Sequence, residues 1–261
     1  MIYYLGTHLH DTVEALSFLR LLDSISFRAI SGAITSLMIT ILFGGRVILY
    51  FYGCGHRDIP RDYLNFQAAG NQAKTYGGVL VVAVILISVA LWCKLDSVFV
   101  LLCLAAIIWF AALGWIEDFL KVRHQSSDRG LSETAKLVLQ ISYGTAFGII
   151  YVTEALSPLP PGLATQLYLP FFKSPVIDLS WAYVPFIAFT ITAISNSVNI
   201  ADGIDGLAIV PTSFVVAVFA VFAYVSSHAK ISTFLIFPFM PGVGEIAVIC
   251  SIVFGACLGF L

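Results

Sequence analysis

The strongest constraint on this chain is a series of seven long, mostly apolar stretches. They cover residues 29–51, 77–95, 97–116, 135–153, 182–199, 207–227 and 245–261. A helix needs about 20 mostly apolar residues to cross the hydrocarbon core of a bilayer, where backbone N–H and C=O groups must be bonded within the protein. The stretches therefore predict an all-α polytopic membrane protein with about seven transmembrane helices, forming a single transmembrane domain over residues 1–261.

The amino-acid composition supports this prediction. Hydrophobic residues make up 59% of the chain and charged residues only 11%, whereas a soluble globular domain carries about 25% charged residues. The 13 lysines and arginines are too few and too scattered to form a nucleic-acid-binding surface. We therefore expect the lipid bilayer as the surroundings of the chain and no nucleic acid among its partners.

Lysine and arginine are distributed unequally between the two sides of the predicted bundle. With seven spans, the loops after the first, third and fifth share one side, which carries Arg46, Arg57, Arg61, Lys74, Lys121, Arg123, Arg129 and Lys136. The opposite side carries Arg20, Arg28, Lys94, Lys173 and Lys230. Because basic residues favour cytoplasmic loops, the first side is predicted to be cytoplasmic. The proline-rich loop 154–181 is then non-cytoplasmic, with a short strand pair expected at "LYLPFFK", residues 167–173.

The last apolar stretch ends without a flanking polar segment. "IAVICSIVFGACLGFL" reaches Leu261 with no basic or aromatic residue cluster of the kind that anchors a span at the membrane surface. We therefore expect the sequence to be an N-terminal fragment of a longer protein, with further transmembrane helices beyond Leu261.

Two acidic clusters lie where predicted spans end. "GWIEDFLK" contains Glu117, Asp118 and Lys121, and "SNSVNIADGIDGLA" contains Asn199, Asp202, Gly203 and Asp205. Carboxylate and amide oxygens suit Mg²⁺, a hard cation that also takes phosphate ligands, and a glycine lets a ligand approach the backbone closely. The acids of the first cluster could equally mark a helix end. That reading is less favoured for the repeated Asn/Asp pattern, because ionisable groups at membrane depth are usually functional.

Three segments resemble the polyprenyl-phosphate sugar-1-phosphate transferase family. "SNSVNIADGIDGLA" resembles the family signature "NAVNxTDGxDGLA", "GWIEDFLKV" resembles "GxxDDxxKV", and "RGLSETAKLVLQ" resembles "GLSxxxKxxxQ". Two further segments, "LYLPFFKSPVIDL" and "FPFMPGVGEIAV", resemble the branch of this family that transfers phospho-N-acetylmuramoyl-pentapeptide. The likeness runs from about Phe27 to Leu261.

The resemblance implies a reaction in peptidoglycan synthesis. Phospho-N-acetylmuramoyl-pentapeptide would pass from its UDP carrier to undecaprenyl phosphate, giving lipid I and UMP in the first membrane step of cell-wall synthesis. The implied cofactor is Mg²⁺, and the implied partners are UDP-MurNAc-pentapeptide and undecaprenyl phosphate. The implied location is the bacterial cytoplasmic (inner) membrane, with the active face toward the cytoplasm. A homodimer is left open.

The resemblance also implies roles for individual residues. The catalytic set would be Glu117, Asp118, Asp202 and Asp205, with Asp118 as the base or acid for the lipid phosphate and Glu117 supporting it. Asn199, Lys121, Lys136 and Gly203 would bind substrate. Asp202 and Asp205 would also support the metal, whose principal ligand is expected beyond Leu261.

The chain departs from the family pattern at three places. Glu117 replaces the first aspartate of the family's pair, and Gly70 stands where the family has a lysine before "TMGG". The family's "MGDxGS" segment, which supplies a further aspartate, would lie after Leu261. Residues 1–261 alone are therefore expected to be inactive.

Two other functions stay open from the sequence. The nearer alternative is a related transferase that uses UDP-N-acetylglucosamine and a polyprenyl phosphate. The more distant one is an ion-coupled transporter, but such proteins often contain inverted repeats and midplane binding sites, and the sequence has no repeat. The sequence does not choose between direct attack by the lipid phosphate and a covalent aspartyl-phosphate intermediate.

Overall fold

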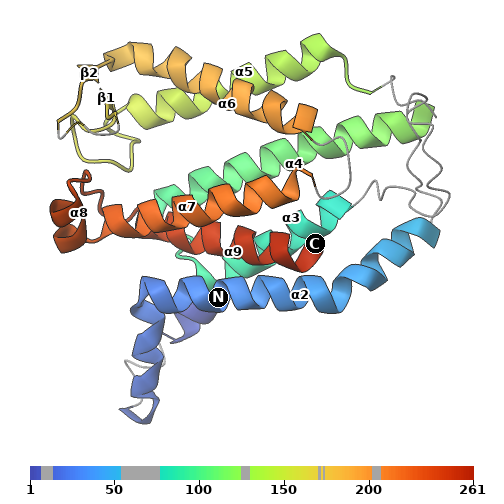
Figure 1. Cartoon of the computed structure of the whole chain (residues 1–261), viewed down its shortest axis with the longest axis horizontal. Coiled ribbons are helices and arrows are strands. Elements are labelled where there is room, and N and C mark those ends of the chain that lie inside the picture. The colour runs from blue at the N-terminus through green and yellow to red at the C-terminus, as the bar shows by residue number, and fades with distance from the viewer. Residues whose placement is uncertain (7–13, 54–76, 125–129, 170–171, 173, 202–206) are drawn as a thin grey trace.

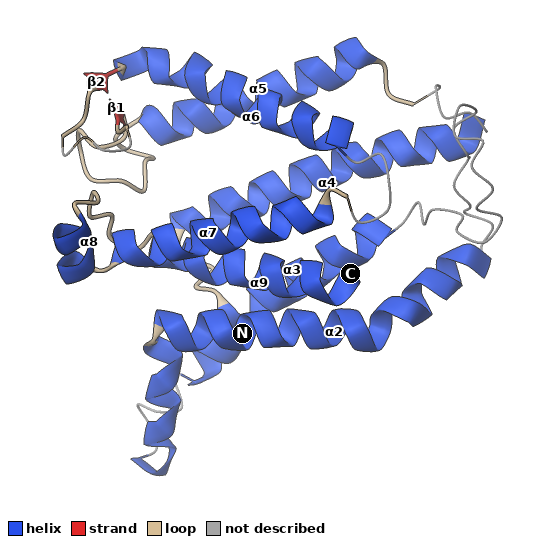
Figure 2. Cartoon of the chain, viewed as in Figure 1, coloured by secondary structure: helices blue, strands red, loops and turns tan. Residues whose placement is uncertain are grey.

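The chain folds into a bundle of long helices that lie side by side (Figure 1). The computed structural model describes residues 1–6, 14–53, 77–124, 130–169, 172, 174–201 and 207–261. Its elements are η1 (Glu14–Asp23), α2 (Ile25–Gly53), α3 (Gly77–Trp92), α4 (Val98–His124), α5 (Glu133–Val152), β1 (Gln166–Leu167), β2 (Ile177–Asp178), η2 (Ser180–Ala182), α6 (Tyr183–Ala201), α7 (Ile209–Ser227), α8 (Ala229–Leu235) and α9 (Gly244–Phe260). Apart from the small strand pair, these described segments are helices and connecting loops (Figure 2).

Each of the seven predicted apolar stretches forms an apolar helix. Five helices are long and apolar enough to cross a membrane, namely α2, α4, α5, α6 with η2, and α7. Helices α3 and α9 are equally apolar but shorter, with 16 and 17 residues. The predicted class, an all-α polytopic membrane protein, is confirmed; the helix predicted at 77–95 ends three residues early, at Trp92, while the one predicted at 245–261 has the expected length.

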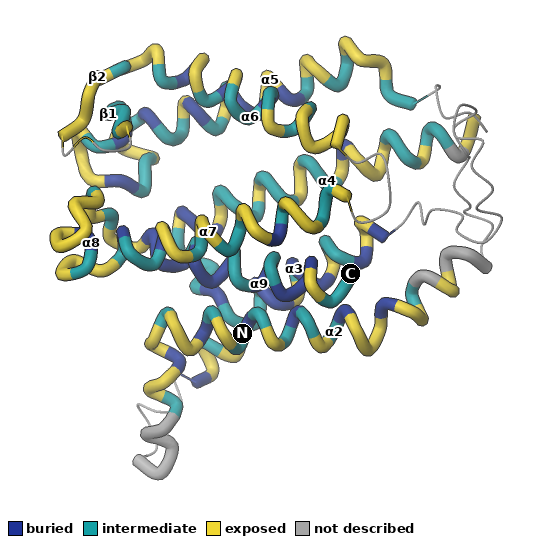
Figure 3. The backbone as a smooth tube through the Cα atoms, in the orientation of Figure 1, coloured by how far each residue is buried: buried dark blue, intermediate teal, exposed yellow. Residues whose placement is uncertain are grey.

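The outer faces of the helices carry large apolar side chains. Phe189 on α6 is 72% exposed and Phe214 on α7 is 67% exposed, and exposed residues line the helices along their whole length (Figure 3). In water such a surface would be strongly unfavourable. In a bilayer it faces hydrocarbon, so the exposed apolar residues are those expected of membrane-spanning helices.

The alternation of helix directions agrees with the predicted grouping of the loops. The C-terminal ends of α2, α4 and α6 and the N-terminal ends of α3, α5 and α7 lie at one end of the bundle, on the right in Figure 1. The α3–α4 connection, the segment between α5 and α6, and helix α8 lie at the opposite end. We call the first the acidic-motif end, because α4 and α6 carry their acidic motifs toward it.

The loop between α5 and α6 contains a strand pair that only partly coincides with the predicted segment. Gln166 pairs with Asp178 and Leu167 with Ile177 in an antiparallel ladder, so only Leu167 of the predicted "LYLPFFK" segment belongs to a strand. Pro170 within that segment has no N–H to donate to a ladder. A strand pair thus forms in the predicted loop and starts at the edge of the predicted segment, but its second strand, Ile177–Asp178, lies after that segment.

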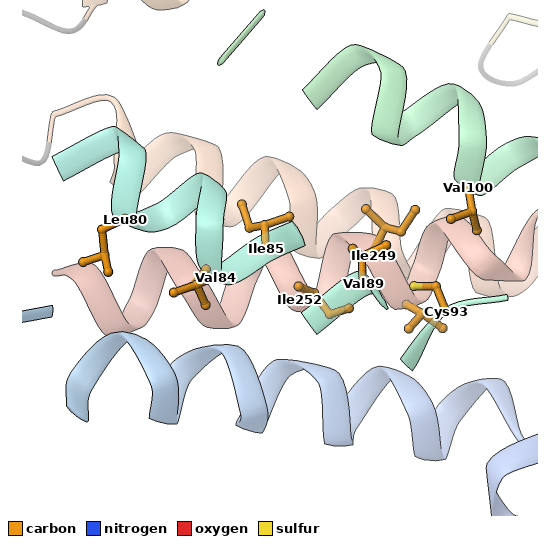
Figure 4. Close-up of a cluster of buried hydrophobic side chains, with 10 residues drawn as sticks. Leu80, Val84, Ile85, Val89, Cys93, Val100, Ile249 and Ile252 are labelled. Atoms are coloured by element: carbon orange, nitrogen blue, oxygen red, sulfur yellow. The ribbon is translucent and has the colours of Figure 1, made fainter. Parts of the chain in front are cut away.

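The best-packed part of the bundle is the contact of α9 with α2 and α3. Buried apolar side chains of α3 meet those of α9 and the start of α4 in one cluster, which includes Leu80, Val84, Ile85, Val89, Val100, Ile249 and Ile252 (Figure 4). On its other side, α9 approaches α2 through Gly255 and Gly259, which are spaced as in a GxxxG motif. A Cβ atom on Gly255 would lie 2.1 Å from the carbonyl oxygen of Ala33. Small residues at this spacing let two helix backbones approach closely in a membrane.

A buried ion pair joins α2 to α9 at the end of the bundle opposite the acidic motifs. Arg28 of α2 is fully buried and donates from Nη1 and Nη2 to the Glu245 carboxylate of α9, at 2.8 and 2.6 Å. The backbone N–H of Lys94, just after α3, also donates to Glu245 at 3.1 Å. The sequence analysis counted Arg28 among the basic residues flanking the membrane. Arg28 does lie at that end, but its charge is paired with Glu245 inside the protein rather than exposed in a loop.

Helices α5 and α6 form a second close pair. A Cβ on Gly144 would lie 2.7 Å from Ala188 Cα, and one on Gly148 would lie 3.1 Å from Val184 Cα. Among the described residues, three sets of contacts connect this pair to the rest of the bundle. They are the Glu117–Lys136 ion pair, the rings of Trp109 and Phe110 against Tyr143, and an apolar cluster of Phe99, Leu159, Ala164 and Val243.

Candidate active site

Glu117 and Asp118 lie inside α4 rather than at its end. The span was predicted to finish at residue 116, but the helix continues to His124. Its last turn carries Lys121, Arg123 and His124, and positive charge near a helix C-terminus is stabilising because the helix dipole is negative there. Both carboxylates are therefore held on a rigid helical backbone about two turns before its end.

Glu117 is paired with two lysines from two different helices. Lys121 Nζ, one turn further along α4, donates to Oε1 at 2.9 Å, and Lys136 Nζ of α5 donates to Oε2 at 2.6 Å. The side chains are 16%, 31% and 18% exposed for Glu117, Lys121 and Lys136. Partly shielded charge-assisted bonds of this kind are stronger than exposed ion pairs, which contribute little. Glu117 therefore holds two ammonium groups beside each other at the acidic-motif end.

The start of α5 is shaped to deliver Lys136 to this position. Gly130 packs so closely that a Cβ there would lie 3.1 Å from Lys121 Cε and 3.3 Å from Glu117 Cγ. Ser132 is the N-cap of α5 and accepts a hydrogen bond from the Ala135 N–H at 3.3 Å, as a serine at this position commonly does. The "GLSETAK" segment thus starts a helix that places Lys136 in its second turn, beside α4.

A polar cluster joins α5 to α6 one turn further along α5. Gln140 is 1% exposed; its Nε2 donates to Ser195 Oγ at 3.0 Å and its Oε1 accepts from Asn196 Nδ2 at 2.9 Å. Asn196 Nδ2 also donates to the Thr192 carbonyl oxygen at 2.9 Å. All three polar side chains lie within helices that are otherwise apolar, so we call Gln140, Ser195 and Asn196 the amide cluster.

The antiparallel packing of α5 and α6 relates Lys136 to the Asn/Asp motif. Gly144 lies against Ala188 and Gln140 against Asn196. Each residue advances about 1.5 Å along a helix, so Lys136 lies about one turn nearer than Gln140 to the acidic-motif end on α5, and Asn199 about one turn nearer than Asn196 on α6. Asn199 is exposed in the last turn of α6, which ends at Ala201.

The structure brings together part of the predicted site. Glu117, Lys121 and Lys136 are in direct contact, and Asp118 follows Glu117 on the same helix, partly buried. The predicted residues Asp202, Gly203 and Asp205, like Gly70, lie outside the described residues. The amide cluster was not singled out from the sequence, although Gln140 and Asn196 stand in the motifs quoted above. A glutamine inside an apolar span is the signal that could have found it.

Some residues of the predicted magnesium site are described by the structure, and others, Asp202 and Asp205, lie outside the described residues. Within the described residues, no three His, Cys, Asp or Glu side chains come together as a metal site. Both oxygens of Glu117 are bonded to lysines, which makes Glu117 a poor candidate for a metal ligand. Asp118, Asp202 and Asp205 would supply hard carboxylate oxygens of the kind that Mg²⁺ takes, so the donor chemistry of this set fits the ion.

The fold and this site define a multi-spanning membrane protein that gathers carboxylates and lysines at one end of its helix bundle, an arrangement suited to binding anionic groups. The sequence model of glycosyl transferase family 4 matches residues 98–261, and the chain therefore belongs to this family. The names of its curated relatives specify one enzyme within this family. The chain is 36% identical over 261 residues to the "Phospho-N-acetylmuramoyl-pentapeptide-transferase" of Chlorobium phaeobacteroides and 37% identical over 261 residues to that of Chlorobium luteolum.

The alignments cover the whole chain. Each of these two relatives is matched over 100% of this chain and 70% of its own length. The protein of the same name from Caulobacter vibrioides is 36% identical over 265 residues, with 71% of its length covered. The resemblance stated from the motifs is confirmed, and the relatives favour neither the N-acetylglucosamine-1-phosphate transferase nor the transporter.

Proposed function

We propose that this chain transfers phospho-N-acetylmuramoyl-pentapeptide from its UDP carrier to undecaprenyl phosphate, giving lipid I and UMP. Relatives that carry the name of this transferase and match the whole chain support the reaction. The membrane fold supports it as well, because the acceptor is a lipid and the donor is a water-soluble nucleotide. The two can meet only at the membrane surface, and Glu117, Asp118 and Asn199 lie near the C-terminal ends of α4 and α6 at one end of the bundle (Figure 1).

The chemistry requires two anionic phosphates to approach each other. An oxygen of the lipid phosphate attacks the phosphorus that is bonded to the sugar, a new P–O bond forms, and the P–O bond to UMP breaks. The second pKa of a phosphate monoester is about 6, so the attacking group is largely ionised at neutral pH. Positioning and charge compensation then matter more than proton removal, as in phosphoryl transfer generally.

The contact between Glu117, Lys121 and Lys136 is the observation that carries the proposed mechanism. One carboxylate holds two ammonium groups from α4 and α5, at 2.9 and 2.6 Å. Each ammonium group has three N–H donors, so both lysines can donate to phosphate oxygens while they stay bonded to Glu117. Donors that are preorganised in this way stabilise developing negative charge effectively.

The remaining roles follow from the positions of the other candidates. Asp118 lies beside this group on α4 and would act as base or acid toward the lipid phosphate. Asn199, Asp202, Gly203 and Asp205 would bind the nucleotide part of the donor or support the metal. When bound, Mg²⁺ would offset the negative charge of the diphosphate. The preference for cytoplasmic lysine and arginine supports a cytoplasmic active face in the bacterial inner membrane.

The test is a transfer assay with the purified protein in detergent or nanodiscs. Radiolabelled UDP-MurNAc-pentapeptide, undecaprenyl phosphate and Mg²⁺ should give labelled lipid I and unlabelled UMP. The matched reaction with UDP-N-acetylglucosamine should give no lipid product. Lipid-linked product from UDP-N-acetylglucosamine alone would overturn the proposed donor, and product that forms without undecaprenyl phosphate would overturn the proposed acceptor.

A further inference from the structure

The amide cluster lies at an unusual place for polar side chains. Gln140 is almost fully buried between two helices whose facing sides are mostly apolar, and both ends of its amide are hydrogen-bonded to α6. A polar group left unpaired in such surroundings is costly. Both polar groups of the Gln140 amide are therefore hydrogen-bonded only while α5 and α6 keep one particular register.

The close helix contact below the cluster does not require these bonds. Gly144 and Gly148 already bring α5 against Ala188 and Val184 of α6, and small residues of this kind associate helices in membranes by packing alone. An interhelical hydrogen bond in a membrane adds only about 0.6 kcal/mol on average. The amide cluster is thus a minor contributor to holding the two helices together.

Its position suggests a different task. Gln140 lies one turn after Lys136, and Asn196 lies one turn before Asn199, so among the described residues the cluster holds the hydrogen bonds between α5 and α6 that lie nearest to the acidic-motif end. A small rotation or slide of α6 beyond Gly144 would change the position of Asn199 relative to Lys136. Packing against glycine resists separation of the helices more than it resists such a slide, because glycine presents no side chain to interlock.

We propose that Gln140, through its paired bonds to Ser195 and Asn196, is a positioning residue that fixes the register between Lys136 of α5 and Asn199 of α6. This inference rests on the proposed function for its catalytic consequence, but the register itself can be measured without activity. Misplacing a catalytic group by about 1 Å can cost on the order of a hundredfold in rate. A modest hydrogen-bonded cluster can therefore have a large effect on turnover and a small effect on stability.

The first experiment compares Gln140→Leu with Ser142→Ala in the full chain. Leucine removes both amide bonds at nearly constant volume. Ser142 is exposed on the same helix, and its hydroxyl donates only to the Leu139 carbonyl oxygen of its own turn. We expect kcat of Gln140→Leu to fall about tenfold or more with little change in KM for the nucleotide or in thermal stability. Ser142→Ala should match the parent. Parental kcat in Gln140→Leu, or a loss explained by less folded protein, would overturn the proposal.

A reciprocal exchange tests the register more directly. Gln140→Asn shortens one side chain by a methylene, and Asn196→Gln lengthens its partner by the same amount. Each single variant should lose turnover, and the double variant should recover several-fold over either single variant. If the two losses simply add, the pair does not act as a unit, and the proposal fails.

Cross-linking provides a readout that does not depend on the reaction. Cysteine at position 136 is combined with cysteine at 199 or at 200. A protease site is introduced in the loop 154–165, so that after cleavage the two halves stay joined on a denaturing gel only if the cysteines have cross-linked. The chain without the engineered pair gives the background from native cysteines. In the protein that keeps Gln140, one of the two cysteine pairs, 136/199 or 136/200, should cross-link in higher yield than the other. In Gln140→Leu the two yields should become similar. An unchanged preference would overturn the register role, whereas a parent that makes no lipid I would overturn the proposed function instead.

Discussion

Replacing Gly255 with alanine is expected to force α9 away from α2. The new Cβ would lie 2.1 Å from the carbonyl oxygen of Ala33 and 2.5 Å from Ser36 Oγ, about 1.3 Å and 0.9 Å short of the 3.4 Å at which ordinary contact begins. The Ala33 oxygen belongs to the backbone of a helix and cannot rotate away as a side chain could. Moving the helices apart also weakens the hydrogen bond from Ser36 Oγ to the Ile252 carbonyl oxygen, now 2.8 Å long.

The expected net loss of stability is about 2 kcal/mol. Overpacking a well-packed interior costs about 1–3 kcal/mol, and a rigid backbone contact belongs at the upper end of that range. The interhelical hydrogen bond contributes about 0.6 kcal/mol more. Alanine is better than glycine in a helix by about 1 kcal/mol, which offsets part of the loss.

Gly114→Ala in α4 is the matched control. It is the same chemical change in a spanning helix, but no atom lies within 4 Å of the new Cβ, so stability should be unchanged or slightly higher. Unfolding of the purified proteins by SDS in mixed micelles, followed by circular dichroism, measures both. If Gly255→Ala resists SDS as well as Gly114→Ala does, α2 and α9 do not approach as closely as described and the argument from the glycine contacts is wrong.

Three further predictions concern the active site. Glu117→Gln removes the charge that holds Lys121 and Lys136 together, so kcat/KM for lipid I formation should fall about tenfold or more, as is common when one preorganised charge contact is lost. Full activity of this variant would show that Glu117 is not needed to hold the two lysines in position for catalysis. Asp118→Asn and Asp202→Asn should each lower kcat by about a hundredfold or more while leaving the protein folded by size exclusion and circular dichroism; near-parental turnover in both would remove these carboxylates from the mechanism. In intact cells, a cysteine introduced at Arg123 should react with a membrane-impermeant thiol reagent only after the membrane is opened, and labelling from outside would reverse the predicted orientation.

Much of the local structure follows from the sequence because the bilayer leaves few choices. A long apolar stretch such as 97–116 must form a helix, since only a helix satisfies its own backbone groups in hydrocarbon. The contact between Glu117 and Lys121 is likewise a local property, because residues four apart face each other once the helix exists. Ser132 before Glu133 in the same way indicates where α5 begins.

Helix partners were not predictable in this way, because most helices of this chain are apolar on every face. In a soluble protein, the apolar stripe shows which face turns inward. Here the sequence carries no such stripe, and partners are chosen by steric fit and by rare polar groups. The contacts of Gly255 with Ala33 and of Gly144 with Ala188 depend on backbones that approach within van der Waals distance, and GxxxG spacing alone does not say which helix will be the partner.

The sequence by itself thus determined the membrane class, the helix positions and the residue types of the candidate site. Only the tertiary structure paired Glu117 with Lys136, Gln140 with Asn196, and Arg28 with Glu245, which are 19, 56 and 217 residues apart. The physical reason is that a charge or amide within an apolar chain must find a partner to avoid an uncompensated desolvation cost. Which partner it finds depends on where the packed helices place it, and that is a property of the folded bundle rather than of any local segment.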